Sequence, residues 1–587
     1  MSSAQACFQP LLAKAQGAVI NAESATTAEV DALLNNLSHV ADGGISGVTF
    51  STSTQAHLAS LHPEKFAANG IVSITASGVS VADLAVLVAS LIGSQTILDV
   101  VNTATDMSLI NSGLEKVAGI KALTIDYSQI PATLSAELAD ELVSKALGTI
   151  TAQGALTVAQ ANSVLTAFNS GATTISLIRG DSHQVAALPV GANDTITAIE
   201  VSNPNVTAQD LLTIDFIAGT INASAVTTLT GTVAEVQAVY AAGGTITGMG
   251  NEAVALVGTV TAAQADTIAN LTTGVLTATV AADTAANLNA ALSHAGATDA
   301  LSLTVTDASV AATALNTLDG KTSVAINAAS VATITATDAQ LAAVSTAFAS
   351  AGIAGLAGKA ITITGSSIAA SDANTLVGLT AGVVTASVAA GTISALNSAL
   401  SNASGTDALT LSFSDTSGVS AAALTALDSK TSVALNAGSV TSVTGTAAEV
   451  TALYEAGALG TITGLGNEAL TISDSVTVAQ ANAVAALTSG AVTATLAEGS
   501  LSALGGLAET NNHYTVTITD TAIDAAALNA LNDKTDVTIT ISGATAVNGS
   551  YADVNAVLTS AGITGWSNPA VALVGTVTAA QADTIAN

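Results

Sequence analysis

The stretch AVALVGTVTAAQADTIAN at residues 253–270 returns unchanged at residues 570–587, 317 positions later. A second stretch, GTITGMGNEA, ends at Ala253, and its near copy GTITGLGNEA ends at Ala469, 216 positions later. The two offsets are about three and two multiples of a unit near 106 residues. Because repetition at a fixed period is typical of chains built from stacked supersecondary units, the sequence predicts a repeat architecture.

Three further landmarks share this period. TVAQAN and its variants begin at residues 157, 261, 369, 477 and 578, in steps of 101 to 108 residues. The lysines of DGKTSV, DSKTSV and NDKTDV are Lys321, Lys430 and Lys534. The aspartates that end LTVTD, LSFSD and VTITD are Asp307, Asp415 and Asp520. The long unit therefore measures about 101–108 residues.

Each long unit divides further into alternating short runs. Runs rich in β-branched residues show a Thr-x-Thr pattern, as at Thr277 and Thr279, which is typical of half-buried strands. Ala- and Leu-rich runs with apolar residues at helical spacing follow them, and these open with Ser, Thr or Asp and often close at Gly, as capped helices do. We therefore expect a strand–turn–short helix stretch of about 22–36 residues, repeated about four times in each long unit.

This stretch is similar in length to leucine-rich repeats, which have about 20–29 residues, although the strict LxxLxLxxN spacing is missing. We predict an α/β fold: a leucine-rich-repeat-like β/α solenoid over residues 66–587, with one long parallel sheet and short Ala-rich helices. Residues 1–65 differ in composition and show a helical pattern over 3–37, so we expect a small helical N-terminal cap or attachment domain. Residue 587 falls in mid-repeat, which predicts that the chain is truncated from a longer protein.

Composition excludes several classes of protein. Ten Lys and Arg residues against 42 Asp and Glu residues give a formal net charge of −32, which argues against nucleic acid as a partner. The most apolar run, residues 79–93, contains Asp83 and is too short to span a bilayer, so no membrane insertion is expected. The N-terminus shows no Sec signal peptide, and Cys7 has no partner for a disulfide within the chain.

Acidic residues fall at the expected strand-to-helix turns. The set is Asp126, Asp215, Asp307, Asp338, Asp415, Asp474 and Asp520. Two interpretations stay open: helix N-capping, in which a carboxylate accepts the first free N–H groups, and binding of calcium as a cofactor. The candidate metal ligands are Asp307, Asp338, Asp415, Asp474 and Asp520.

Other candidate sites are weaker. The Thr-x-Thr ladders suit an ice-binding face, but they also suit any exposed strand, and the strand sequences vary too much for a regular lattice. His57 and His62 lie near Glu64, a spacing that a metal site could use, whereas His183, His294 and His513 are read as ordinary surface residues. No nucleophile elbow, P-loop or CxxC pattern occurs, and no catalytic residues or bound cofactor are predicted, so the chain is expected not to be an enzyme.

The acidic Ala/Thr-rich repeats, such as LTTGVLTATV at 271–280 and DALTLSFSDTSG at 407–418, resemble those of bacterial S-layer and giant surface proteins that are exported by type I secretion. The resemblance is to cyanobacterial and proteobacterial members and implies an extracellular or cell-surface location. We expect a structural protein of a surface layer, matrix or adhesin stalk, with itself or cell-surface components as partners. The alternatives are a phage or bacterial fibre that binds a host receptor, and an intracellular scaffold.

Overall fold

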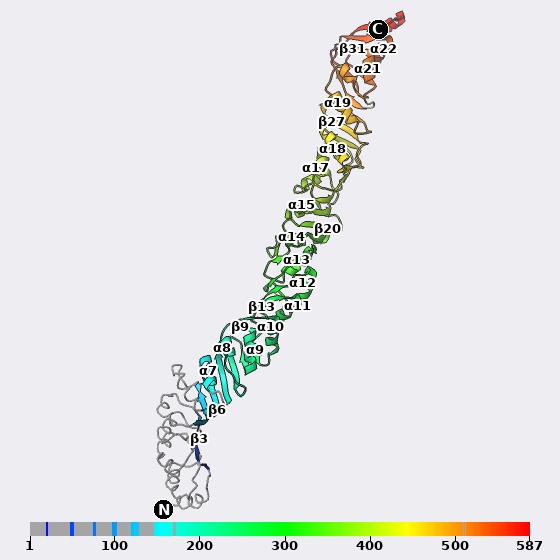
Figure 1. Cartoon of the computed structure of the whole chain (residues 1–587). Helices are drawn as coiled ribbons and strands as arrows, with labels where there is room; N and C mark the ends of the chain where they lie inside the picture. Colours follow the sequence, from blue (N-terminus) through cyan, green and yellow to red (C-terminus); the bar gives the residue numbers. More distant parts are fainter. Residues whose placement is uncertain are drawn as a thin grey trace, which may run out of the picture. The chain divides into compact units, whose positions relative to one another are not determined.

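The computed structural model describes residues 146–167, 172–508, 510 and 512–586, and short strands at 19–21, 47–51, 74–77, 97–101 and 119–127. The chain forms two compact units. One comprises Met1–Ala281, Ala290–Leu303 and Lys321–Val324, and the other Ala282–Asn289, Thr304–Gly320 and Ala325–Asn587. Within each unit short strands and short helices alternate along the chain (Figure 1). We call each strand–turn–helix stretch a segment.

The first unit contains three parallel sheets in its described residues. The three-stranded sheet has the order β1 (Val19–Asn21), β2 (Gly47–Ser51), β3 (Ile74–Ser77). The seven-stranded sheet has the order β12 (Ile246–Thr247), β10 (Ala218–Asn222), β8 (Thr195–Val201), β7 (Ala172–Gly180), β6 (Ala146–Thr157), β5 (Gly119–Asp126), β4 (Ile97–Val101). The five-stranded sheet has the order β15 (Ala300–Ser302), β14 (Leu276–Val280), β13 (Ala253–Val260), β11 (Thr228–Gly231), β9 (Asn205–Thr207).

The second unit contains six smaller parallel sheets in its described residues. Two have five strands: β16 (Ser309–Ala311), β18 (Thr333–Thr337), β20 (Ala360–Thr364), β21 (Val384–Ser387), β22 (Ala408–Thr410); and β23 (Val419–Ser420), β25 (Ser442–Gly445), β27 (Ala469–Val476), β28 (Val492–Leu496), β29 (His513–Thr515). The others have two or three: β17 (Ile326–Asn327), β19 (Ile353–Ala354); β24 (Leu435–Asn436), β26 (Ile462–Thr463); β30 (Thr517–Ile518), β32 (Ile539–Ile541), β34 (Ile563–Thr564); β31 (Ala522–Asp524), β33 (Ala546–Gly549), β35 (Ala570–Leu573).

The helices are short and follow the strands in nearly every segment. They are α7 (Val158–Ala167), α8 (Ser182–Ala186), α9 (Ala208–Ile217), α10 (Val233–Ala241), α11 (Ala262–Ala269), α12 (Ala285–Ala291), α13 (Ala312–Asp319), the 3₁₀ turn η5 (Asp338–Gln340), α14 (Leu341–Ala349), α15 (Ala370–Leu379), α16 (Ile393–Ala399), α17 (Ala421–Asp428), α18 (Ala447–Leu459), α19 (Val478–Ala485), α20 (Leu501–Leu504), α21 (Ala525–Asn532), α22 (Tyr551–Thr559) and α23 (Ala579–Ala586).

The core lies between each strand and the helix that follows it. In β14, Leu276, Ala278 and Val280 are buried and the two threonines between them are exposed, so the Thr-x-Thr pattern marks an outward face as predicted. In α17, Leu424 and Leu427 are buried on one helical face. Such small apolar faces cannot stabilise a segment alone, so each segment depends on its neighbours.

The predicted helix caps are confirmed for many of the described helices, but α13 and α15 follow Ala311 and Ala369 and have no side-chain cap. The TVAQAN landmark and the relatives that begin with threonine form capping boxes, because the threonine hydroxyl accepts the N–H of the residue three positions on and the Gln side chain accepts the threonine N–H in return. Thr261 and Gln264 of α11 show this arrangement, and so do Thr477 and Gln480 of α19. Helix α18 ends at Gly460, whose φ of 81° favours glycine.

The α/β class and the parallel strand pairing are as predicted, but the prediction of one long parallel sheet is wrong. The described strands form separate sheets of two to seven strands. Many strands have only two to five residues, and the register between β13 and β14 shifts between Ala255 and Thr259. Between several neighbouring segments, side-chain hydrogen bonds are found in place of a strand ladder, and the sheets end there.

The expected N-terminal cap lies mostly outside the described residues. Within the stretch 3–37 that the pattern assigned to helix, Val19–Asn21 forms strand β1, and it pairs with β2 in parallel. The boundary at residue 65 stays a prediction. In the part of the chain that the structure describes, no helix combines the length and apolar character that crossing a bilayer requires. The apolar run 79–93 is outside that part.

Candidate functional site

Four of the candidate metal-ligating aspartates cap a helix of the preceding segment. The Asp307 carboxylate accepts the N–H of Ala285, the first residue of α12, at 2.7 Å. Asp415 accepts the N–H of Ile393 in α16 at 2.8 Å. The other two contacts are Asp520 to the Leu501 N–H at 2.6 Å and Asp474 to the Ala447 N–H at 2.9 Å. Each carboxylate therefore stabilises the positive end of a neighbouring helix.

The remaining acidic candidates are scattered. Asp338 lies in η5, and its carboxylate packs closely against Gly365. A Cβ atom at residue 365 would lie 2.5 Å from Asp338 Oδ1, and the φ of +102° there also favours glycine. Asp215 accepts a hydrogen bond from the Thr245 hydroxyl. The side chain of Asp126, and His57, His62 and Glu64, lie outside the described residues. Among the described residues no group of three or more His, Cys, Asp and Glu side chains is placed to hold a metal ion, and calcium stays a prediction.

The lysine landmark forms a clamp between segments with the threonine that follows it. Lys430 Nζ donates to the carbonyl of Leu400, at the C-terminal end of α16, at 2.8 Å. The buried Thr431 hydroxyl donates to the Leu409 carbonyl at 2.6 Å and accepts the Val433 N–H at 3.0 Å. Lys321 with Thr322, and Lys534 with Thr535, repeat these contacts. We call each of the three pairs a Lys–Thr clamp.

A buried aspartate accompanies the clamp. Asp407 is 3 % exposed, and its two carboxylate oxygens accept the Val384 N–H at 3.1 Å and the Ser404 N–H at 3.0 Å. Asp299 makes the matching contacts one long unit earlier. In the last unit Asn512 takes this place and accepts the Val492 N–H at 2.8 Å. Each of these buried polar groups accepts hydrogen bonds from backbone N–H groups, as burial requires.

The GNEA stretches contain a second buried acid. Glu252 accepts hydrogen bonds from the Tyr240 hydroxyl and from the Gly250 N–H, the latter at 2.7 Å. Glu468 is bonded in the same way to the Tyr454 hydroxyl at 2.5 Å and the Gly466 N–H at 2.8 Å. Burial, together with the adjacent carboxylate, raises the pKa of both tyrosines well above the usual range. GNEA is therefore a turn-stabilising sequence.

The three histidines in the described part of the chain each face an aspartate. The Nδ1 atoms of His183, His294 and His513 lie 3.3, 2.9 and 2.5 Å from carboxylate oxygens of Asp210, Asp266 and Asp536. Burial favours the neutral form of Asp266, but hydrogen bonds from His294 and Ser293 outweigh it and hold the pKa of Asp266 below its ordinary value. These are separate surface pairs that link segments.

One segment departs from this scheme and contains a hollow. Residues 194–222 match 407–436, with Asp194 in the place of Asp407, but Ile217 and Ala218 stand where the clamp residues Lys430 and Thr431 would be. The hollow has a volume of about 370 Å³. Its lining residues are Asp194, Thr195, Ile196, Thr197, Phe216, Ile217, Ala218 and Gly219.

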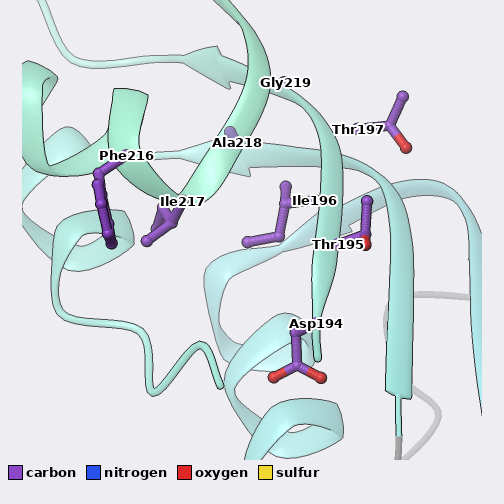
Figure 2. Close-up of a pocket in the computed structure, with 8 residues that line it drawn as sticks. All are labelled: Asp194, Thr195, Ile196, Thr197, Phe216, Ile217, Ala218 and Gly219. Carbon is purple, nitrogen blue, oxygen red and sulfur yellow. The ribbon is translucent and has the colours of Figure 1, made fainter. Parts of the chain in front are cut away.

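The hollow lies between the end of α9 and the start of β8. Figure 2 shows the Phe216 and Ile217 side chains next to each other, with Ile196 directed toward Ile217. Phe216 is 93 % exposed. The Asp194 carboxylate accepts the Thr173 N–H at 3.0 Å and the Gly191 N–H at 2.7 Å. The Thr195 and Thr197 side chains lie on the other side of the strands from Phe216, and the Asp194 carboxylate is already bonded, so these groups do not face one common space (Figure 2).

The repeated lysines and aspartates were predictable as landmarks, but their contacts were not, and the exposed ring of Phe216 was not predicted. A usable signal was present, because a residue that breaks the repeat in one copy has no role in the shared fold. Phe216 stands where the other copies have Gly320, Ser429 and Asp533. No known family model matches this sequence, and the search of curated proteins finds no significant relative.

Proposed function

We propose that this chain is a non-enzymatic, extracellular structural protein of a surface layer, matrix or adhesin stalk, built as an acidic leucine-rich-repeat-like β/α solenoid. One observation carries the proposal. The charged and polar residues that recur in three successive long units are engaged in backbone hydrogen bonds between segments, as in the Lys–Thr clamp and the capping aspartates. Residues with these contacts hold neighbouring segments together, which suits a protein whose role is to be long and stiff.

The solenoid is the arrangement that best explains these contacts. A capping carboxylate that reaches back by one segment, from Asp415 to Ile393 for example, is useful when successive segments stack in the same way each time. Strands of neighbouring segments also pair in parallel, as β18 does with β20 over five residues. Both features favour a stack in which each segment covers the apolar face of its neighbour.

The net charge of −32 supports a location exposed to solvent. Strong charge of one sign keeps a protein soluble and limits nonspecific adhesion. We expect assembly partners to be further copies of the chain or cell-surface components. Calcium, which would neutralise this charge, is the ion whose effect on assembly we would test first.

Cell fractionation with an antibody against the chain tests the location. We expect the protein in the washed outer-surface or extracellular fraction, and immunogold labelling outside the cell envelope. A chain found only in the cytosol would overturn the proposal and favour an intracellular scaffold. Small-angle X-ray scattering of the purified chain tests the solenoid, because a stack gives the scattering of a thin extended body and a globular particle would contradict it.

A further inference from the structure

Two stretches of identical sequence differ in what covers them. Residues 253–270 and 570–587 both read AVALVGTVTAAQADTIAN, so a difference in their structure comes from their neighbours. We call the first the covered copy and the second the open copy. In the covered copy β13 lies between two strands, β11 and β14, whereas β35 of the open copy has one strand neighbour, β33, among the described residues.

The two copies are paired in the same way on one side. In the covered copy Val254 pairs with Leu229 of β11, and in the open copy Val571 pairs with Val547 of β33. Both ladders are parallel and run over four residue pairs, from the alanine that begins the copy to the leucine that follows. The open copy is therefore placed in its sheet as the covered copy is, and the two differ at the opposite strand edge.

Burial differs in the way that a missing strand would cause. Val254 is 1 % exposed in the covered copy, and the matching Val571 is 37 % exposed in the open copy. Helix α11 of the covered copy buries Ala265 and Ile268, whereas α23 of the open copy buries none of its described residues. An unpaired strand edge beside uncovered apolar side chains is a template for a further strand.

The covered copy shows which kind of strand fits this edge. There β14 pairs with β13 in parallel with Val254 opposite Leu276, and the Val254 N–H donates to the Val275 carbonyl at 2.9 Å. Alternate side chains of β14 are buried, namely those of Leu276, Ala278 and Val280. A fitting strand therefore alternates apolar residues with threonine and carries no charge.

We propose that the open copy binds an extended segment of the type of residues 271–281, LTTGVLTATVA, supplied by another polypeptide, which adds to β35 as a parallel strand. Main-chain hydrogen bonds supply affinity, and burial of alternate apolar side chains against Val571 and α23 supplies specificity. Because such a segment is uncharged, it can approach a chain with a net charge of −32 without repulsion.

One substitution beside the edge is compatible with this mode. Pro569 stands in the open copy's flank where the covered copy has Glu252. In the covered copy the Thr272 hydroxyl, from the added strand's side, donates to the backbone carbonyl of Glu252 at 2.7 Å. Proline lacks the N–H but retains this carbonyl, so the same contact is available to an incoming segment.

A fluorescent peptide of residues 271–281, titrated into the full purified chain, tests the proposal by anisotropy. We expect saturable binding of one peptide per chain, because the chain's own β14 already occupies the covered copy. Val571→Asp places a charge in the contact and should weaken binding about tenfold or more. Leu276→Asp in the peptide should weaken it as much, and this result is independent of how the Val571 variant folds.

Val574→Asp is the matched control. Val574 is 65 % exposed, and its counterpart Val257 stays 57 % exposed in the covered copy, so an added strand leaves this position uncovered. The same charge here should leave peptide binding unchanged.

The proposal is overturned if the peptide does not bind, if the Leu276→Asp peptide binds as well as the parent peptide, or if Val574→Asp weakens binding as much as Val571→Asp. Dimers of the chain that Val571→Asp abolishes, in the absence of peptide binding, would overturn it too and assign this face to a second molecule of the chain. The assay uses purified protein, so its result is independent of where the cell places the chain.

Discussion

Two regions with the same repeat pattern, residues 194–222 and 407–436, join neighbouring segments in different ways. In the first, β10 pairs with β8 in parallel, from Ala218 with Ile196 to Asn222 with Glu200. In the second, β22 is the last strand of its sheet. The Thr431 hydroxyl donates to the Leu409 carbonyl there, where the first region has a paired strand. The first connection from Asp215 to Asn222 is one residue shorter than the matching one from Asp428 to Asn436.

The region with the extra residue also has Lys430 and Thr431 in place of Ile217 and Ala218, so length and side chains change together where a side-chain clamp replaces a strand ladder. A one-residue difference in length matters for strand pairing, because a shift of one position moves every side chain to the opposite face. A buried threonine then supplies the hydrogen bonds that the ladder would have made, and the preceding lysine caps the neighbouring helix. The ladder region keeps a seven-stranded sheet, and the clamp regions have short ones.

The largest effect is expected from the acid that both regions share. Asp407→Ala leaves the Val384 and Ser404 N–H groups unpaired in a buried place, which should cost about 2–4 kcal/mol of local stability. Asp194→Ala should cost less, about 1–2 kcal/mol, because Asp194 is only half-buried and water can replace it. Hydrogen exchange of peptides covering 384–410 and 173–196 measures both. Equal costs would contradict the comparison.

The clamp threonine comes next. Thr431→Val removes the hydroxyl that serves the Leu409 carbonyl and the Val433 N–H, so we expect a loss of about 1–3 kcal/mol. Thr431→Ser retains the hydroxyl and should cost clearly less. In the ladder region, Ala218→Ser adds a hydroxyl that the strand pairing does not need and should change stability little. Local hydrogen exchange is again the measurement, and a Val variant as stable as Ser would refute the clamp.

The lysine should have a moderate effect. Lys430→Met keeps the length of the side chain and removes its bond to the Leu400 carbonyl at the end of α16, at a cost of about 0.5–1.5 kcal/mol. The change should raise exchange at the C-terminal turn of α16. Lys359→Met, which also loses a bond to a backbone carbonyl, that of Ala329, but on an exposed surface, is the matched control and should cost less.

The smallest effect concerns acid pH. The folded-state pKa of Asp266 is below its ordinary value, so its contribution to stability is present above about pH 4 and is lost as the pH falls through the folded value. His294→Ala should raise the pKa of Asp266 and move that loss to higher pH. NMR titration of the Asp266 carboxyl measures this. Asp283, whose pKa is lowered by Asn287 and the Thr284 N–H, should not respond.

The segment pattern was predictable because period and alternation depend on local residue types. Thr277 and Thr279 face outward and Thr261 caps α11 as the sequence indicates. The role of Asp415 was only half predictable: it does cap a helix, but that helix lies 22 residues upstream, and no local pattern reveals the partner. The breaks between sheets could not be predicted, because the contacts of Thr431 that accompany the extra residue before Asn436 are tertiary.

The two matching turns at Glu252 and Glu468 allow the chain to change in length by a whole block of residues. Each buried glutamate is followed by alanine, each is bonded to a tyrosine and to a glycine N–H, and the two lie 216 residues apart. Removal of residues 253–468 would join Glu252 to Ala469 and recreate the same local bonds at the junction. A protein that is one such block shorter would thus keep a complete turn at the junction, so a change in length by a whole block leaves this local structure intact.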